Sequence, residues 1–144
     1  IYSRMRFLAP SRIQGVQVKN SLLADGCLIE EGVTIENSVV GLRCRIGRGA
    51  TIRNSIIMGA DYYESPEQIA DAHSRGLPSM GIAAGSTIED AIVDKNVRIG
   101  SNVHIGNVHK VDEWEGAPDV LIRDGIVCVG KAATLPDGWS IDTV

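Results

Sequence analysis

The stretch Val18-Lys-Asn-Ser-Leu-Leu23 returns three times along this chain, as Ile35-Glu-Asn-Ser-Val-Val40, Ile52-Arg-Asn-Ser-Ile-Ile57 and Ile88-Glu-Asp-Ala-Ile-Val93. The first three copies start seventeen residues apart. The fourth starts thirty-six residues after the third, which is one further unit plus nineteen inserted residues. A phrase that returns at a fixed interval is typical of a solenoid, in which each repeat packs on its neighbours.

Aliphatic residues recur within each unit at steps of six, six and five. They are Leu23, Ile29, Ile35, Val40, Ile46, Ile52 and Ile57, followed beyond the insertion by Ile82, Ile88, Val93, Ile99 and Ile105. Gly, Asp and Asn cluster between these short apolar segments, where tight corners need a permissive or left-handed backbone. Three short strands per unit and a hexapeptide period predict an all-β fold, a single parallel β-helix with triangular coils.

A second small or apolar position follows most of these anchors by four residues. Its occupants are Cys27, Val33, Val39, Cys44, Ala50, Ile56, Ile92, Val97 and Val103. Residues two apart on a strand share a face, so we expect this position and the next anchor to point inward together. Where the step is five, two apolar residues are adjacent, as in Val39-Val40, and we expect a corner to separate them. A β-sandwich also has regular short strands, but it does not repeat one phrase in register.

Composition limits the classes of protein and partner. The 144 residues carry a net charge of −4 and 4% aromatic residues, which predicts one domain with a thin aliphatic core. Nucleic-acid binding is not expected, since it needs a net basic surface. No apolar run approaches the roughly 18 residues of a membrane span, so no membrane partner is expected. Cys27 and Cys44 are predicted to be small buried thiols on adjacent coils, and Cys128 has no metal-site spacing.

The insertion, at about residues 59–81, carries helix signals. Ser65-Pro-Glu-Gln68 supplies an N-cap, a proline at the first helical position and a capping box. We expect a short helix from about Pro66 to Arg75, with Gly76 just beyond its end. Asp61, Tyr62 and Tyr63, which precede it, are candidates for an interface or a loop anchor.

The two ends of the chain lack the repeat. Residues 1–12 are predicted to be an arm that arrives from an upstream catalytic domain, and residues 13–144 to be the β-helix. Residues 107–120 have no clear place, and Trp114, Gly116 and Pro118 suggest a loop before the last coil. The chain has no glycine-rich phosphate loop, paired carboxylates at a strand end or nucleophile elbow. We therefore expect a non-catalytic piece of a longer enzyme.

Several segments make the chain resemble a known family. They are Val39-Val-Gly-Leu-Arg43, Ile57-Met-Gly-Ala-Asp-Tyr-Tyr-Glu64, Ala91-Ile-Val-Asp-Lys-Asn-Val-Arg-Ile-Gly100, the arm Arg6-Phe-Leu-Ala-Pro-Ser11 and the closing Gly125-Ile-Val-Cys-Val-Gly-Lys131. In this order, insertion included, they are similar to the C-terminal domain of ADP-glucose pyrophosphorylase (glucose-1-phosphate adenylyltransferase). The resemblance implies a left-handed β-helix.

The resemblance also implies a function. Family members make ADP-glucose and pyrophosphate from ATP and glucose 1-phosphate, in glycogen or starch synthesis, in the cytoplasm or the plastid stroma. The chemistry and its Mg²⁺ belong to an N-terminal nucleotidyltransferase domain, so no cofactor is expected here. The β-helix domain packs on that domain, joins other subunits of a homotetramer and helps bind a phosphorylated sugar-metabolite effector. The insertion resembles the branch activated by 3-phosphoglycerate and inhibited by phosphate.

Site residues follow from the matching motifs. The family's activator lysines correspond to Lys95 in Asp-Lys-Asn and to Lys131 in the last repeat, and the arm's arginine to Arg6. Arg4 stands where relatives often carry Gln, which would shift effector preference. Converging cations suit phosphate and carboxylate, with arginine as a fork and lysine as a point charge. No catalytic or metal residue is expected.

Two other functions fit a hexapeptide solenoid. A hexapeptide-repeat acyltransferase would use a loop histidine as base between subunits, and the candidates are His73, His104 and His109. His73 falls in the expected helix, and His104 follows inward-facing Val103, so it should point outward. A purely structural trimerisation domain is the third class.

Overall fold

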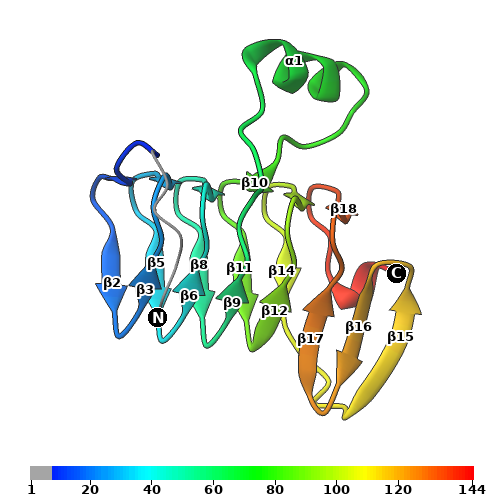
Figure 1. The fold of residues 1–144 in the computed structure, drawn as a ribbon. Helices are drawn as coiled ribbons and strands as arrows, with labels where there is room; N and C mark the ends of the chain where they lie inside the picture. The colour runs from blue at the N-terminus through cyan, green and yellow to red at the C-terminus, as the bar shows by residue number, and fades with distance from the viewer. Residues whose placement is uncertain (1–7) are drawn as a thin grey trace.

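The chain winds into a stack of three-sided coils with one arm-like insertion, as Figure 1 shows for the computed structural model. The structure describes residues 8–144. Each coil contributes one short strand to each of three sheets, and equivalent strands of successive coils pair in parallel. The stacked repeat predicted from the sequence is confirmed, and residues 8–144 do not form a sandwich of two packed sheets.

The three sheets run along the three sides of the stack. The first holds β1 (Arg12–Ile13), β4 (Leu28–Ile29), β7 (Arg45–Ile46), β10 (Gly81–Ile82), β13 (Arg98–Ile99) and β18 (Thr134–Leu135). The second holds β2 (Gln17–Lys19), β5 (Thr34–Glu36), β8 (Thr51–Arg53), β11 (Thr87–Glu89) and β14 (His104–Ile105). The third holds β3 (Leu22–Leu23), β6 (Val39–Val40), β9 (Ile56–Ile57), β12 (Ala91–Val93), β17 (Ile126–Val129), β16 (Val120–Arg123) and β15 (Glu113–Ala117).

The register follows the repeat in the sequence. On the second sheet Ile35 pairs with Ile52, which pairs with Ile88 across the insertion, and Ile88 pairs with Ile105. All four side chains are fully buried. Burying an aliphatic side chain of this size stabilises the fold by roughly 1.5–3 kcal/mol. The axis of the stack is therefore a continuous column of aliphatics.

One feature of the expected inward face is wrong. Val39 and Ile56 were expected to face the core, but they are 40% and 45% exposed, and Ile92 is half-buried. Val39 and Val40 lie on the same strand, and no corner separates them. Because neighbours on a strand face opposite sides, Val40 takes the inward position and Val39 points out.

The corner of the five-residue step lies earlier, at Asn37. Its φ of +48° is in the left-handed region, which asparagine tolerates better than most side chains. The turn is one residue shorter than at the other corners, so the inward position two before the anchor falls on Ser38. Its hydroxyl donates to the carbonyl of Glu36 at 2.7 Å and accepts from the amide of Ser55 at 3.1 Å. The buried hydroxyl is thus fully satisfied.

The insertion leaves the stack after β9 and returns at β10, and it carries α1 (Pro66–Ser74) clear of the coils in Figure 1. The predicted capping box is confirmed. The amide of Gln68 donates to Ser65 Oγ at 3.2 Å, and Gln68 Oε1 accepts from the amide of Ser65 at 2.8 Å. Gly76 follows the helix with a φ of +73°. The expected helix boundaries hold to within one residue.

Residues 107–120 do not form the expected loop. Trp114 and Gly116 lie on β15, which pairs antiparallel with β16, and β16 pairs antiparallel with β17 at the end of the third sheet. The turn between β16 and β17 is Asp124-Gly125, with φ of +50° and +78°. Both values suit a two-residue hairpin turn. Asp-Gly between apolar runs is a hairpin signal that the expectation of a loop overlooked. Trp114, on the neighbouring strand β15, packs on the core. A short 3₁₀-helix, η1 (Ile141–Thr143), closes the chain.

Isosteric substitutions at Val39 and Val40 test the corrected inward face. Val40→Thr places a hydroxyl in the aliphatic column, and we expect it to lower the free energy of unfolding by about 1–3 kcal/mol. Val39→Thr exposes the same hydroxyl to water and should change it by less than about 0.5 kcal/mol. Urea unfolding measures both. Equal losses for the two variants would contradict the assignment of faces.

Candidate anion-binding corner

The corner between the third and first sheets brings the two predicted lysines together. Lys95 lies in the turn from β12 to β13, and Lys131 lies in the turn from β17 to β18. Val93 pairs with Val129 before these turns, and the amide of Ala132 donates to the carbonyl of Lys95 at 2.9 Å. The two lysines therefore occupy the same position on neighbouring coils. Neighbouring strands lie about 4.8 Å apart, so their side chains start close together.

The backbone of this corner repeats from coil to coil. Asn96 and Ala132, which follow the two lysines, both adopt left-handed conformations, with φ of +61° and +60°. The sequence separates Lys95 and Lys131 by thirty-six residues because the hairpin of β15 and β16 lies between them. Sequence reasoning selected both residues but not their adjacency, which needs the pairing of β12 with β17.

Asp61, at the start of the insertion, occupies this corner. Its Oδ1 accepts from Lys95 Nζ at 3.1 Å, its Oδ2 accepts from Asn96 Nδ2 at 3.1 Å, and its amide donates to Asn96 Oδ1 at 2.9 Å. The hydrogen bond from Lys95, then that from Asn96, and more weakly the charge of Lys131 hold the pKa of Asp61 below its ordinary value. Asp61 is therefore an anion facing two cations, and it anchors the insertion to the corner.

A second anchor holds the other end of the insertion. The side chain of Glu64 is 4% exposed and forms an ion pair with Arg98, with 2.7 Å between Oε2 and Nη2. Glu64 Oε1 accepts from the amide of Met80. Arg98 also donates to the carbonyl of Pro78 at 2.9 Å. The carboxylate and the guanidinium thus tie the outgoing and the returning segments of the insertion to the first sheet. A charge-assisted hydrogen bond between a guanidinium and a desolvated carboxylate is stronger than one between neutral groups.

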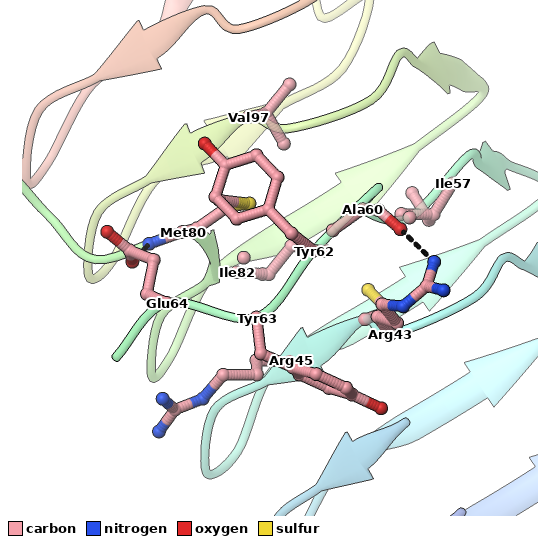
Figure 2. Close-up of a pocket in the computed structure, with 13 residues that line it drawn as sticks. Arg43, Arg45, Ile57, Ala60, Tyr62, Tyr63, Glu64, Met80, Ile82 and Val97 are labelled. Atoms are coloured by element: carbon pink, nitrogen blue, oxygen red, sulfur yellow. Dashed lines mark hydrogen bonds between the residues drawn. The ribbon is translucent and has the colours of Figure 1, made fainter. Parts of the chain in front are cut away.

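Two half-exposed tyrosines lie at the base of the insertion. Figure 2 shows Tyr62 on one side and Tyr63 on the other side of a small hollow, with Arg45 beside Tyr63. The hydroxyl of Tyr63 donates to the carbonyl of Gly26 at 2.7 Å. The accessible volume of the hollow is about 20 Å³, enough for about one water molecule. It is too small for a metabolite, so Asp61 and the lysines, not this hollow, define the candidate site.

The other candidates are placed as follows. Arg4 and Arg6 lie outside the described residues. His73 is on α1, and His104 is half-buried on β14. His109 Nε2 lies 2.7 Å from Asp142 Oδ1, a pairing that sequence spacing did not indicate, and both side chains are exposed.

The cysteines lie as expected. Cys27 and Cys44 are buried free thiols, and burial raises the pKa of both, which makes them unreactive. Cys128 is half-buried and also unpaired by any disulfide. Among residues 8–144, no three His, Cys, Asp or Glu side chains are grouped to hold a metal ion. No helix in the described part of the chain is long and apolar enough to cross a bilayer.

The outer face of the third sheet carries an apolar row. Its members, paired from coil to coil, are Leu22, Val39, Ile56, Ile92 and Cys128. Leu22, the most exposed, is 53% accessible. A charged row runs beside the apolar row, along the C-terminal ends of the strands of the second sheet. Its members are Lys19, Glu36, Arg53 and Glu89. Arg53 pairs with both glutamates at 3.3 Å.

The comparisons with known proteins agree with this architecture. The model of the GLGC left-handed parallel beta-helix domain matches residues 6–140. Over 143 residues the chain is 44% identical to the chloroplastic/amyloplastic small subunit of glucose-1-phosphate adenylyltransferase from Triticum aestivum. That alignment covers 98% of this chain and 30% of the wheat protein. The chain thus spans less than a third of the length of this relative.

The stacked coils define a left-handed parallel β-helix domain. More specifically, the chain belongs to the GLGC left-handed parallel beta-helix domain family. The expected resemblance to the C-terminal domain of glucose-1-phosphate adenylyltransferase is confirmed. The acyltransferase alternative has no support from these matches.

Removing the buried anchor tests how the insertion is held. Glu64→Ala leaves Arg98 without its carboxylate and the Met80 amide without its acceptor. We expect the free energy of opening the insertion to fall by about 3 kcal/mol. This is the lower end of the range for a broken buried ion pair, because Arg98 keeps some contact with water. Limited proteolysis within residues 59–81 measures this opening.

Asp71→Ala is the matched control, since it removes an exposed ion pair with Arg75 on α1. Such pairs contribute less than about 1 kcal/mol. Equal cleavage rates in the two variants would show that Glu64 does not anchor the insertion.

Proposed function

We propose that this chain is the regulatory and oligomerisation domain of a glucose-1-phosphate adenylyltransferase, which forms ADP-glucose and pyrophosphate from ATP and glucose 1-phosphate in starch or glycogen synthesis. The family match and the wheat relative support the enzyme. The observation that carries the regulatory role is the convergence of Lys95 and Lys131 on one corner. The plastid stroma is the proposed location, because the relative is chloroplastic/amyloplastic.

The corner suits a phosphorylated sugar-metabolite effector. Lysine ammonium groups act as point charges for phosphate. Two of them on neighbouring coils can contact two oxygens of one phosphate, or a phosphate and a carboxylate of one small molecule. Arg6 and Arg4, on the arm, would also bind the effector and neutralise its remaining negative charge. The effector would then link arm and solenoid, and so bias the orientation of an N-terminal domain.

Catalysis is assigned outside this chain. The chain matches a β-helix domain model and covers 30% of the wheat relative, so most of such an enzyme lies outside it. The N-terminal nucleotidyltransferase domain would hold both Mg²⁺ and the substrates. Within the enzyme, the β-helix domain would bind the effector and other subunits, and carry no step of the reaction.

The apolar row is the proposed contact with another subunit of a homotetramer. The charged row beside it is self-complementary about a two-fold axis between Glu36 and Arg53. In a second copy turned by that axis, Lys19 faces Glu89, and Glu36 faces Arg53. A two-fold contact requires this property of a surface. Val39 and Ile56, the apolar residues on either side of the axis, would then pack on Ile56 and Val39 of the second copy.

Effector dependence tests the lysine corner. In the full-length enzyme, the double substitution Lys95→Ala and Lys131→Ala removes both point charges, and the activator concentration for half-maximal stimulation should rise at least about tenfold, or about 1.4 kcal/mol. Lys110→Ala, a lysine of another turn, is the control and should respond as the parent does. An unchanged activator response in the double variant would remove the assignment.

Assembly tests the apolar row. We expect Val39→Lys with Ile56→Lys to dissociate the full-length oligomer, because four buried ammonium groups would meet at the two-fold axis. Thr34→Lys with Thr51→Lys adds the same charge on the outer face of the second sheet and should leave assembly intact. Sedimentation equilibrium gives the masses.

Unchanged mass in the Val39→Lys, Ile56→Lys variant would contradict the subunit contact. If mass is retained but the two domains then unfold separately, the row instead covers the enzyme's own N-terminal domain.

A further inference from the structure

The carboxylate of Asp61 occupies two hydrogen-bond donors of the candidate corner. One carboxylate oxygen accepts from Lys95 Nζ and the other accepts from Asn96 Nδ2, both at 3.1 Å. The insertion thus places the carboxylate of Asp61 on Lys95, a lysine predicted to bind the effector. Asp61 is an anion at neutral pH, and the hydrogen bond from Lys95 lowers its pKa further.

We propose that Asp61 is an internal competitor of the anionic effector: its carboxylate stands where a phosphate group binds, and the phosphate must displace it from Lys95. This inference rests on the proposed function, since it assumes that Lys95 binds the effector. A carboxylate and a phosphate monoester both offer oxygen acceptors to an ammonium group, so one can replace the other.

The competition makes the corner selective. Asp61 is a monoanion whose hydrogen bond reaches Lys95, while Lys131 acts on it through its charge alone. A phosphate dianion has more charge and three terminal oxygens, so it can contact both lysines at once. A ligand with a single carboxylate gains nothing over Asp61 itself. The corner should therefore favour phosphate groups over monocarboxylates.

Displacement has a local structural consequence. Asn96 Nδ2 would lose its acceptor, Asp61 Oδ2, when the Asp61 side chain leaves. The Asn96 side chain is then less firmly held, so the hydrogen bond from the Asp61 amide to Asn96 Oδ1 weakens. The neighbouring contacts do not depend on that carboxylate. The carbonyl of Ala60 accepts from Arg43 Nη1 at 3.2 Å, as Figure 2 shows, and the Glu64–Arg98 pair holds the insertion further on. Release is thus confined to the segment around Asp61.

Inorganic phosphate is the probe for this competition, measured by calorimetry with the full-length protein. Asp61→Asn removes the negative charge and keeps the shape. We expect it to tighten phosphate binding by about three- to tenfold. Asp71→Asn makes the same change of net charge on α1 of the same insertion and should leave phosphate binding as it is. Weaker or unchanged phosphate binding in Asp61→Asn would overturn the inference, and weaker binding would make Asp61 a positioning residue for Lys95.

Two further measurements separate this inference from the proposed function. If Lys95→Ala leaves phosphate binding unchanged, the effector site itself is wrong, and the inference falls with it. If Lys95→Ala weakens binding but Asp61→Asn does not tighten it, the competition alone is wrong. Hydrogen exchange adds a direct readout: saturating phosphate should speed exchange of the Asp61 amide in the unmodified protein. Slower exchange would mean that Asp61 stays on the corner.

Discussion

The pairing of each coil's inward aliphatics with those of the next coil is the interaction on which the rest of the structure depends. Ile35, Ile52, Ile88 and Ile105 form one such column without a break across the insertion. The corners can be tight because residues such as Asn37 accept a left-handed backbone. With the coils in register, residues at equivalent positions become rows on the surface.

These rows give the domain its proposed surfaces. The corner row brings Lys95 and Lys131 together although thirty-six residues separate them. The outer row of the third sheet is apolar, and the adjacent row alternates in charge. The insertion departs from the repeat, and its contacts are therefore specific: Asp61 reaches the corner and Glu64 reaches Arg98. A rigid scaffold that carries one irregular loop is a common way to position binding residues.

Much of the fold could be predicted from the sequence, because each seventeen-residue repeat forms one coil of the stack. The helix of the insertion could be predicted as well, since its capping box is local. The outward direction of Val39 could not, because two apolar neighbours do not reveal which one is buried. The antiparallel strands β15 and β16 were missed, although Asp124-Gly125 marked the turn from β16 to β17. Lys95 was found by resemblance, but its contact with Asp61 needed the path of the insertion in space.

The stacking of the coils brings Lys95 and Lys131 together, and we infer that both bind a single anion. A crystal structure of the protein grown with inorganic phosphate tests it most directly. We expect a phosphate within hydrogen-bonding distance of both Nζ atoms, with the Asp61 carboxylate turned away from Lys95. An intact Asp61–Lys95 pair at saturating phosphate, with no anion on this corner, would contradict it.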